Sequence, residues 1–483
     1  LMRRAYITGS AGFIGFYLAE LLLQDGWSVT GLDGLTDYYD VRLKHRRLQM
    51  LGQHKNFHPI TAMLEDEAAV MNSVAQAKPD VIVHLAAQAG VRYSLENPRA
   101  YIESNVLGTF NVMEAARVHG VTHLMMASTS SVYGANTQMP FHENDKADTP
   151  LTIYAATKKA NEAMAHSYAH LWDIPTTMFR FFTVYGAWGR PDLALYKFVD
   201  AMLEGRPIDI YNNGDMYRDF THVKDLVRGI RLLMDVPPVR PAHPSDIMDG
   251  DSLSPVAPHR VVNIGNSDKV RLMDFIDAIE HSLGLKAIRN YMPMQPGDVP
   301  ATWADTSLLQ KFTNYRPQTD FRAGVDGAVF AMAHAHDFFL AGEAIPHVGL
   351  GLVRAADCHG HLQGRLVRTA VELAEQGADG GGDGGLDRGQ RTGADAPGEG
   401  AAIEAVFHLQ DLGGVEHPHL LWGGRGAQEH GEEVFVEQPA RCRGQHHLAL
   451  AEPVVGGDEG GDFRGEEQAV FRVRLHIHGL FPG

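Results

Sequence analysis

The chain has 483 residues, 44% of them hydrophobic and 21% charged, so it is long enough for two or three domains and apolar enough for a large core. Its formal charge of −17 argues against a nucleic-acid-binding surface and leaves a small molecule as the expected ligand. With only Cys358 and Cys442, and no apolar run of membrane-spanning length, the sequence predicts no disulfide framework, no membrane contact and a reducing, cytoplasmic location.

In the first half of the chain, short β-branched or apolar runs alternate with longer amphipathic segments. The predicted strands are Ala5–Thr8, Ser28–Leu32, Phe57–Thr61, Asp80–Leu85 and His123–Ala127. The predicted helices are Phe13–Gln24, Asp66–Gln76, Arg99–His119 and Tyr154–Leu171. This alternation predicts an α/β fold: a doubly wound (Rossmann) parallel sheet with helices on both faces, which we assign to residues 2–184.

The regular alternation loosens from about Tyr185 onward. Residues 237–258 are rich in proline, aspartate and serine, which predicts a long surface loop. We therefore assign residues 185–340 to a smaller C-terminal subdomain that binds substrate and is completed by returning segments.

The composition changes abruptly near residue 341. From residue 342 onward there is no Lys, Ser, Asn, Tyr or Met, whereas eleven of the 26 histidines lie there. Gly377–Gly400 contains ten glycines and almost nothing apolar, so residues 341–483 are expected to form a disordered tail, with isolated strands at Val406–Leu412 and Val470–His478. One hypothesis is that this tail comes from a different reading frame, as Leu1 before Met2 suggests for the start. The alternative is a low-complexity tail that binds a partner.

A glycine-rich segment follows the first predicted strand and opens the first helix. Gly9 permits the tight turn, Gly12 lets a pyrophosphate approach the backbone amides, and Gly15 lets helix and strand pack closely. Asp33 closes the second strand, where its carboxylate can accept the ribose hydroxyls of NAD and would repel the 2′-phosphate of NADP. The sequence therefore predicts an NAD site.

Three further residues have the properties of a proton-transfer site. Tyr154 and Lys158 are four apart, on one face of a predicted helix. Thr129 lies in a hydroxyl-rich run just after the fifth strand, at the sheet edge where doubly wound folds bind ligands. We predict that Tyr154 is the catalytic base, that Lys158 stabilises its phenolate, and that Thr129 hydrogen-bonds the reacting hydroxyl.

Residues 2 to about 340 resemble the extended short-chain dehydrogenase/reductase sugar epimerases, most closely the UDP-glucuronate 4-epimerases. The resemblance rests on the motifs at residues 37–44, 84–94, 179–186 and 295–299, besides the glycine-rich segment and the Tyr/Lys pair. It implies transient oxidation of a UDP-hexuronate at C4 by bound NAD, rotation of the 4-keto sugar and reduction on its other face. It also implies a homodimer, formed through the helices at Arg99–His119 and Tyr154–Leu171.

The resemblance extends both sets of binding residues. The predicted cofactor-binding residues are Gly9, Gly12, Phe13, Ile14, Gly15, Asp33, Leu85, Ala86, Ala87, Tyr154 and Lys158. The predicted substrate-binding residues are Arg92, Ser94, Ser130, Thr183, Arg190, Arg218 and Asp298. Among these, similarity assigns Arg218 to the UDP pyrophosphate, and Thr183 with Arg190 to the sugar carboxylate. Met63 stands where many relatives have an aspartate that contacts adenine, a contact that Asp66 could replace.

Other functions stay open on the sequence alone. They are a UDP-glucose/galactose 4-epimerase, a UDP-glucuronate decarboxylase and a catalytically silent NAD-binding module. Dehydratases of this fold usually have an acidic pair after the catalytic threonine, where this chain has Ser130 and Ser131. Cys358, His359 and His361 lack a fourth spaced ligand, so we predict no metal site.

Overall fold

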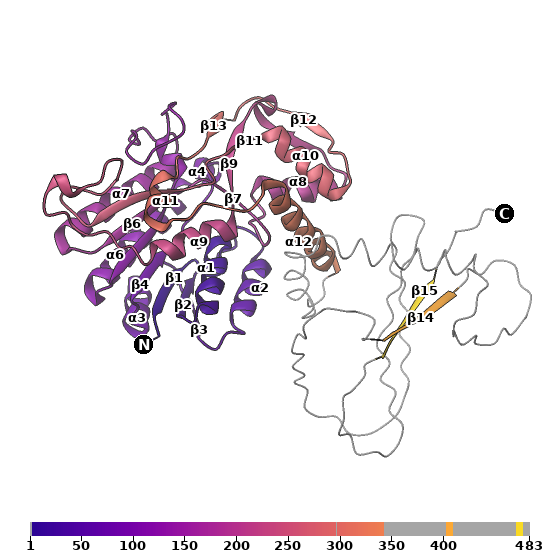
Figure 1. Ribbon diagram of the computed structural model, residues 1–483, viewed down its shortest axis with the longest axis horizontal. Coiled ribbons are helices and arrows are strands. Elements are labelled where there is room, and N and C mark those ends of the chain that lie inside the picture. The colour runs from indigo at the N-terminus through magenta and orange to yellow at the C-terminus, as the bar shows by residue number, and fades with distance from the viewer. Residues whose placement is uncertain (1, 296, 342–401, 409–469, 477–483) are drawn as a thin grey trace, which may run out of the picture. The chain divides into compact units, whose positions relative to one another are not determined.

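The computed structural model describes residues 2–295, 297–341, 402–408 and 470–476 (Figure 1). Its contacts divide the chain into two units, Leu1–Glu375 and Gln376–Gly483. In the described ranges, no helix is both long and apolar enough to cross a membrane.

A seven-stranded sheet, with every strand parallel to its neighbours, forms the centre of the first unit. In spatial order its strands are β10 (His259–Ile264), β6 (Thr176–Phe181), β5 (His123–Thr129), β4 (Val81–His84), β1 (Arg4–Thr8), β2 (Ser28–Asp33) and β3 (Phe57–Thr61). The order reverses between β1 and β4, which creates the crevice where such sheets bind ligands. The predicted doubly wound sheet is confirmed, and β6 and β10 extend it.

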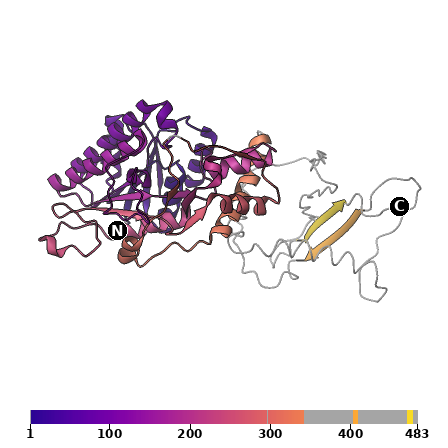
Figure 2. The same ribbon diagram turned by 90° about the horizontal axis from the view of Figure 1, so that it is seen from above.

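Helices cover both faces of this sheet (Figure 2). One face carries α1 (Phe13–Gln24), α2 (Val41–Leu51), α9 (Val223–Leu233) and α11 (Ser307–Thr313). The other carries α3 (Glu67–Ala77), α6 (Gly108–His119) and α7 (Ile153–Trp172). Each helix buries an apolar stripe against the strands, so the sheet lies between two hydrophobic cores.

The helix predicted at Arg99–His119 is confirmed, since helical residues run without a break from Pro98 to His119, but the π-helical stretch inside it was not predicted. After α4 (Tyr93–Glu96), the structure has α5 (Pro98–Tyr101), the π-helix η1 (Ile102–Leu107) and then α6. The wider π-helical turn accommodates Asn105, which is fully buried and hydrogen-bonds the backbone of Gln88.

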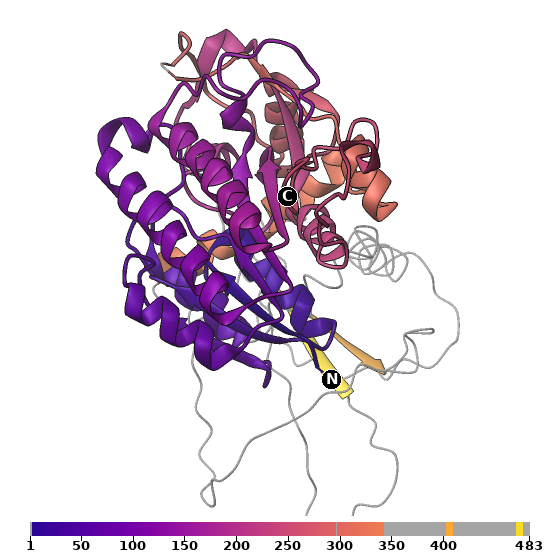
Figure 3. The same cartoon turned by 90° about the vertical axis from the view of Figure 1, so that its left-hand side faces the viewer.

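A smaller layer follows β6 in the chain (Figure 3). It has its own aromatic and aliphatic core. Its strands are β7 (Thr183–Tyr185), β9 (Tyr217–His222), β11 (Lys269–Arg271) and β13 (Ala301–Thr302), with β8 (Ile208–Ile210) paired to β12 (Arg289–Tyr291). Its helices are α8 (Ala194–Leu203), α10 (Leu272–Leu283) and α12 (Phe321–Ala341). Between these segments α9 and β10 return to the main sheet, so the two layers are interleaved along the chain, and the predicted boundary at residue 184 falls within β7.

In the second unit the structure describes two strands, β14 (Ala402–His408) and β15 (Val470–His476), which pair antiparallel with each other. They overlap the two predicted strands, which were expected to be isolated. The glycine-rich segment Gly377–Gly400 and the Cys358 group lie outside the described residues.

Ending the chain after Ala341 is expected to leave the folding of residues 2–341 unchanged. The hydrophobic cores that hold the sheet and the smaller layer are made of residues before Ala341, including Met332 of α12. The thermal unfolding midpoint and NAD binding of the shortened chain should match those of the full chain. An unfolded product would show that residues 342–483 belong to the fold.

Candidate active site

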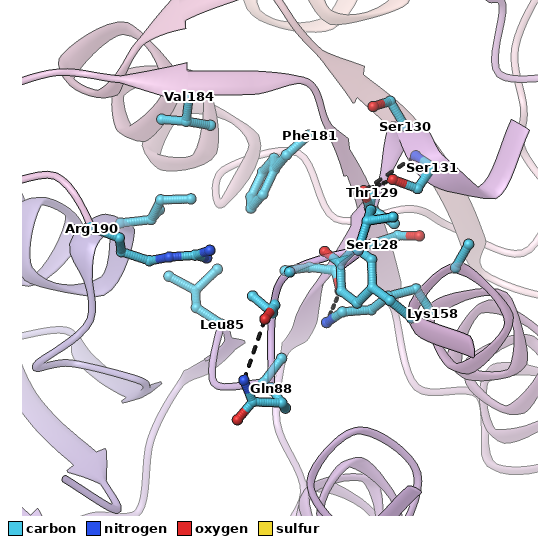
Figure 4. Close-up of a pocket in the computed structure, with 18 of the residues that line it drawn as sticks. Leu85, Gln88, Ser128, Thr129, Ser130, Ser131, Lys158, Phe181, Val184 and Arg190 are labelled. Carbon is cyan, nitrogen blue, oxygen red and sulfur yellow. Dashed lines mark hydrogen bonds between the residues drawn. The ribbon is translucent and has the colours of Figure 1, made fainter. Parts of the chain in front are cut away.

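A cavity of about 490 Å³ lies at the carboxyl ends of the central strands. The β1–α1 loop, the ends of β4 and β5, the start of α7 and segments of the smaller layer line it. Figure 4 shows Arg190 entering this cavity from the side opposite Lys158 and the serines. The sheet and the smaller layer thus contribute side chains to one site.

The glycine-rich loop forms a cradle that side chains would fill. Gly9 has a φ of +77°, and a Cβ there would lie 2.9 Å from the backbone nitrogen of Ala86. A Cβ on Gly15 would lie 2.0 Å from the carbonyl oxygen of Gly9. Since the loop opens directly onto the N-terminus of α1, its geometry fits a dinucleotide pyrophosphate.

Asp33 is held at the end of β2 beside this loop. Its Oδ2 accepts the N–H of Ala11 at 3.0 Å and its Oδ1 accepts that of Leu35 at 2.9 Å. A carboxylate oxygen can accept a further hydrogen bond, so Asp33 is placed to receive ribose hydroxyls. Met63 also lines the cavity, whereas Asp66 caps α3 by accepting the N–H of Ala69.

All the predicted cofactor-binding residues line the same cavity. They are Gly9, Gly12, Phe13, Ile14, Gly15, Asp33, Leu85, Ala86, Ala87, Tyr154 and Lys158. The chain thus has a glycine cradle and a ribose-facing carboxylate, and both fit NAD.

Thr129, Tyr154 and Lys158 come together at the end of β5 and the start of α7. Burial raises the pKa of the Tyr154 phenol, and the Thr129 hydroxyl and the Arg190 charge act in the opposite direction. Burial lowers the pKa of Lys158 to about 8, and its Nζ donates to the carbonyl of Ala127 at 2.9 Å. Burial is the larger effect, so the pKa of the phenol is raised overall, and Thr129 and Arg190 offset part of that rise.

A buried ion pair supports the end of β5 from behind. Arg180 of β6 donates from Nε and Nη2 to the two carboxylate oxygens of Glu162 on α7, each at 2.9 Å. Ser128, the neighbour of Thr129, donates to Glu162 at 2.7 Å. Burial would raise the pKa of Glu162, but Arg180 holds it well below its usual range. No sequence pattern predicted this ion pair, although Glu162 is one turn beyond Lys158 on the same helix.

His84 connects the glycine-rich loop to the loop after β4. Thr8 Oγ1 accepts the N–H groups of Leu85 and Ala86, so its own hydrogen is free to donate to His84 Nδ1, 2.7 Å away. The ring hydrogen is then on Nε2, which donates to Thr109 at 2.9 Å. Burial, reinforced by the nearby charge of Lys158, lowers the pKa of His84 to about 3, so the ring is neutral.

A buried neutral His84 is expected to make the fold acid-sensitive. Its folded pKa is below the unfolded value of about 6.5, so its contribution is fully present above pH 6.5 and is lost as the pH falls towards 3. The expected slope from this residue is about 1.4 kcal/mol per pH unit. Urea unfolding between pH 7 and 4.5 should show a shallower slope for His84→Gln than for the natural chain. Equal slopes would contradict a neutral, buried ring.

Asn105 fixes the loop next to Lys158. Its side chain accepts the N–H of Gln88 at 2.8 Å and donates to the carbonyl of Gln88 at 3.0 Å and to Thr157 Oγ1 at 3.2 Å. These contacts hold the cavity wall at Gln88 against α7. No pattern in the sequence pointed to Asn105, because its partners come from other parts of the chain.

Arg190 reaches the cavity as part of an ion pair. Its Nε and Nη2 donate to the two oxygens of Asp192 at 2.9 and 2.5 Å, and Tyr38 Oη donates to the same carboxylate at 3.3 Å. Thr183 and Ser130 line the same cavity. The pairing occupies one edge of the guanidinium and leaves Nη1 available to a ligand.

The other predicted substrate residues divide into two groups. Arg218 and Asp298 line the cavity and form an ion pair at 2.7 Å. Arg92 and Ser94 are not among the lining residues: Arg92 lies over the ring of Tyr211, and Ser94 is buried and donates to the carbonyl of Val91. Within the described part of the chain, no cluster of His, Cys, Asp or Glu could hold a metal ion.

Comparison with known proteins gives the site a family context. Residues 5–243 match the model of the NAD-dependent epimerase/dehydratase family. A probable UDP-glucuronate 4-epimerase of Rhizobium meliloti (strain 1021) is 54% identical over 322 residues, which cover 67% of this chain and 94% of that protein. Protein CapI of Staphylococcus aureus is 49% identical over 323 residues, covering 66% and 95%.

The fold is also similar to solved structures. UDP-glucuronic acid 4-epimerase from Bacillus cereus, in complex with UDP-glucuronic acid and NAD, superposes with a TM-score of 0.61 and 28% identity. The match covers 68% of this chain and 99% of that structure.

Proposed function

The chain belongs to the NAD-dependent epimerase/dehydratase family, and from this we propose that it is a UDP-glucuronate 4-epimerase, which interconverts UDP-glucuronate and UDP-galacturonate with NAD as cofactor. The observation that carries the proposal is that Thr129, Tyr154 and Lys158 share one cavity with Arg190. A proton-transfer group and a cation for the sugar carboxylate are what this reaction requires of the protein's side chains, besides a hydride acceptor.

The chemistry assigned to the side chains follows from their surroundings. Tyr154, as phenolate, removes the proton of the C4 hydroxyl while the C4–H hydrogen leaves as hydride. Thr129, which hydrogen-bonds Tyr154, also hydrogen-bonds the C4 hydroxyl, and the role assigned to Lys158, one turn along α7 and lining the same cavity, is to stabilise the phenolate by its charge. NAD, which the glycine-rich loop and Asp33 would hold, would supply the group that takes up the hydride and gives it back. Because proton and hydride both return to the sugar, the reaction is an isomerisation without net redox change.

Substrate recognition in this proposal uses cations at two ends of the cavity. Arg218, oriented by Asp298, binds the UDP pyrophosphate. Arg190 and Thr183 bind the sugar carboxylate, and Ser130 lines the same cavity from the side opposite Arg190. Holding the carboxylate matters because a 4-keto uronate is a β-keto acid that loses CO2 readily.

The proposal includes a homodimer and a cytoplasmic location. Exposed apolar side chains lie along the helices that the family resemblance assigns to the dimer: Leu107 is 46%, Phe110 41% and Leu171 65% exposed. Burying such side chains against a second copy would stabilise a dimer. The cytoplasm is where NAD and UDP-sugars are available together.

An NMR time course with UDP-glucuronate, first without and then with added NAD, tests the function. We expect UDP-galacturonate to form without release of CO2 and without accumulation of NADH. UDP-xylose would instead indicate a decarboxylase. If UDP-glucuronate is unchanged and UDP-glucose is epimerised, the enzyme is a neutral-sugar epimerase. If no UDP-sugar reacts, the proposal of an enzyme fails.

A further inference from the structure

The backbone carbonyls of the three residues before Arg190 accept hydrogen bonds from side chains of α1 and α2. Tyr17 Oη of α1 donates to the carbonyl of Ala187 at 3.0 Å. Arg47 Nη2 of α2 donates to the carbonyls of Trp188 at 2.6 Å and Gly189 at 3.3 Å. Three successive carbonyls therefore have partners in the α1 and α2 layer, and the next residue extends its side chain into the cavity (Figure 4).

Trp188 has an uncommon backbone conformation. Its φ is +55°, in the left-handed region that residues with large side chains rarely adopt. Such a conformation is unfavourable and persists where surrounding contacts impose it. The hydrogen bond from Arg47 to the Trp188 carbonyl is one such contact. It gives the turn before Arg190 a fixed direction.

The second terminal nitrogen of Arg47 binds the cofactor loop. Nη1 donates to the carbonyl of Ala11 at 2.8 Å and to Tyr39 Oη at 2.9 Å. Asp33 accepts the N–H of the same Ala11. Residue 11 is therefore held on one side by the carboxylate that faces the ribose and on the other by the guanidinium that holds the Trp188 turn.

Arg47 is unusual for a buried arginine. Its side chain is fully buried, yet the hydrogen bonds described for it go to three backbone carbonyls and one phenol, and none goes to a carboxylate. Burying a charge without a carboxylate partner costs free energy, and hydrogen bonds to the charged group are needed to offset that cost. Only the planar fork of a guanidinium can reach both loops at once.

We propose that Arg47 is a positioning residue for recognition of the sugar carboxylate: it fastens the Trp188–Gly189 turn to the cofactor loop and so sets the direction in which Arg190 faces the ligand. The inference rests on the proposed function, because the carboxylate is that of a UDP-hexuronate. Beyond that function, the inference states that one side chain, Arg47, connects the cofactor loop to the turn that carries Arg190.

The test measures carboxylate selectivity by binding. In the full-length, NAD-loaded chain with Tyr154→Phe to prevent turnover, calorimetry gives the Kd of UDP-glucuronate and of UDP-glucose. Arg47→Lys keeps the charge but not the fork, and should reduce the preference for UDP-glucuronate by about tenfold, equivalent to about 1.4 kcal/mol. Arg46→Lys on the same helix, whose described hydrogen bond is to Gln49, should leave the preference unchanged.

A double-mutant cycle separates positioning from general stabilisation. If Arg47 acts through Arg190, then Arg47→Lys should have no further effect on selectivity once Arg190→Ala is present. Additive losses, or equal losses of affinity for both sugars, would overturn the inference. If Arg47→Lys does not fold, Tyr17→Phe makes the same test through the Ala187 carbonyl, with a smaller expected loss.

Hydrogen–deuterium exchange gives a readout that needs no sugar. In the NAD-loaded chain, Arg47→Lys should increase deuterium uptake in residues 186–192 relative to Arg46→Lys. Unchanged uptake would overturn the inference. Failure of wild-type turnover, by contrast, would overturn only the proposed function, since exchange and binding are measured independently of it.

Discussion

Replacing Tyr154 with phenylalanine is expected to lower the epimerisation rate by at least about 10²- to 10⁴-fold, the usual contribution of a positioned proton-transfer group. The substitution removes the phenol oxygen and keeps the ring, which packs edge-on against Tyr101 at 6.0 Å between centroids. Lys158 keeps its bond to the Ala127 carbonyl, so the cofactor cavity should survive. NMR rates with UDP-glucuronate, together with the NAD released on denaturation, measure both effects.

Tyr168→Phe is the matched control for this prediction. Tyr168 is on the same helix, but its phenol donates to Glu114, away from the residues that line the cavity. The control should retain wild-type turnover. Wild-type turnover in Tyr154→Phe would refute the assignment of the base, and loss of bound NAD would show that the phenol is needed for the cavity itself.

Local sequence signals were sufficient for much of the fold. The helix at Phe13–Gln24 has the predicted bounds because its glycine-rich start and its apolar spacing are both local features. The strands with continuous apolar runs were likewise predictable to within a few residues. The helix at Arg99–His119 was also predicted to within one residue, but its π-helical stretch was not, because that stretch depends on contacts of Asn105 with Gln88 and Thr157. Those partners are close in space and distant in sequence.

The same distinction applies to the candidate site. The residues placed in the cavity by motif, such as Gly9, Tyr154 and Arg190, do line it. Arg47 and Glu162 were missed because a sequence shows their charge but not that they are buried. Arg47, for example, meets the Trp188 carbonyl across 141 residues of chain. Supporting residues of this kind become visible only when the fold brings their partners together.

Replacing Arg190 with alanine is expected to reduce kcat/KM for UDP-glucuronate by about 10²- to 10³-fold, because a buried charge-assisted contact is lost. This fall in kcat/KM should be larger than the effect of losing the Arg190–carboxylate contact alone. In the natural chain the side chain of Asp192 is only 22% exposed and is paired with Arg190. In the variant it would be an uncompensated anion that faces an anionic sugar. UDP-glucose has no carboxylate, so its inhibition constant should change by less than about tenfold.

The double variant Arg190→Ala/Asp192→Ala separates the two causes. Removing Asp192 as well eliminates the repulsion, so UDP-glucuronate activity should recover in part but stay below that of the natural chain. Initial rates by NMR, with UDP-glucose as competitor, give both constants for each variant. Equal losses for the two sugars would remove the carboxylate role from Arg190. Release of CO2 by the single variant would add that Arg190 also protects the 4-keto uronate, since a carboxylate that is no longer held can reach the geometry for its own loss.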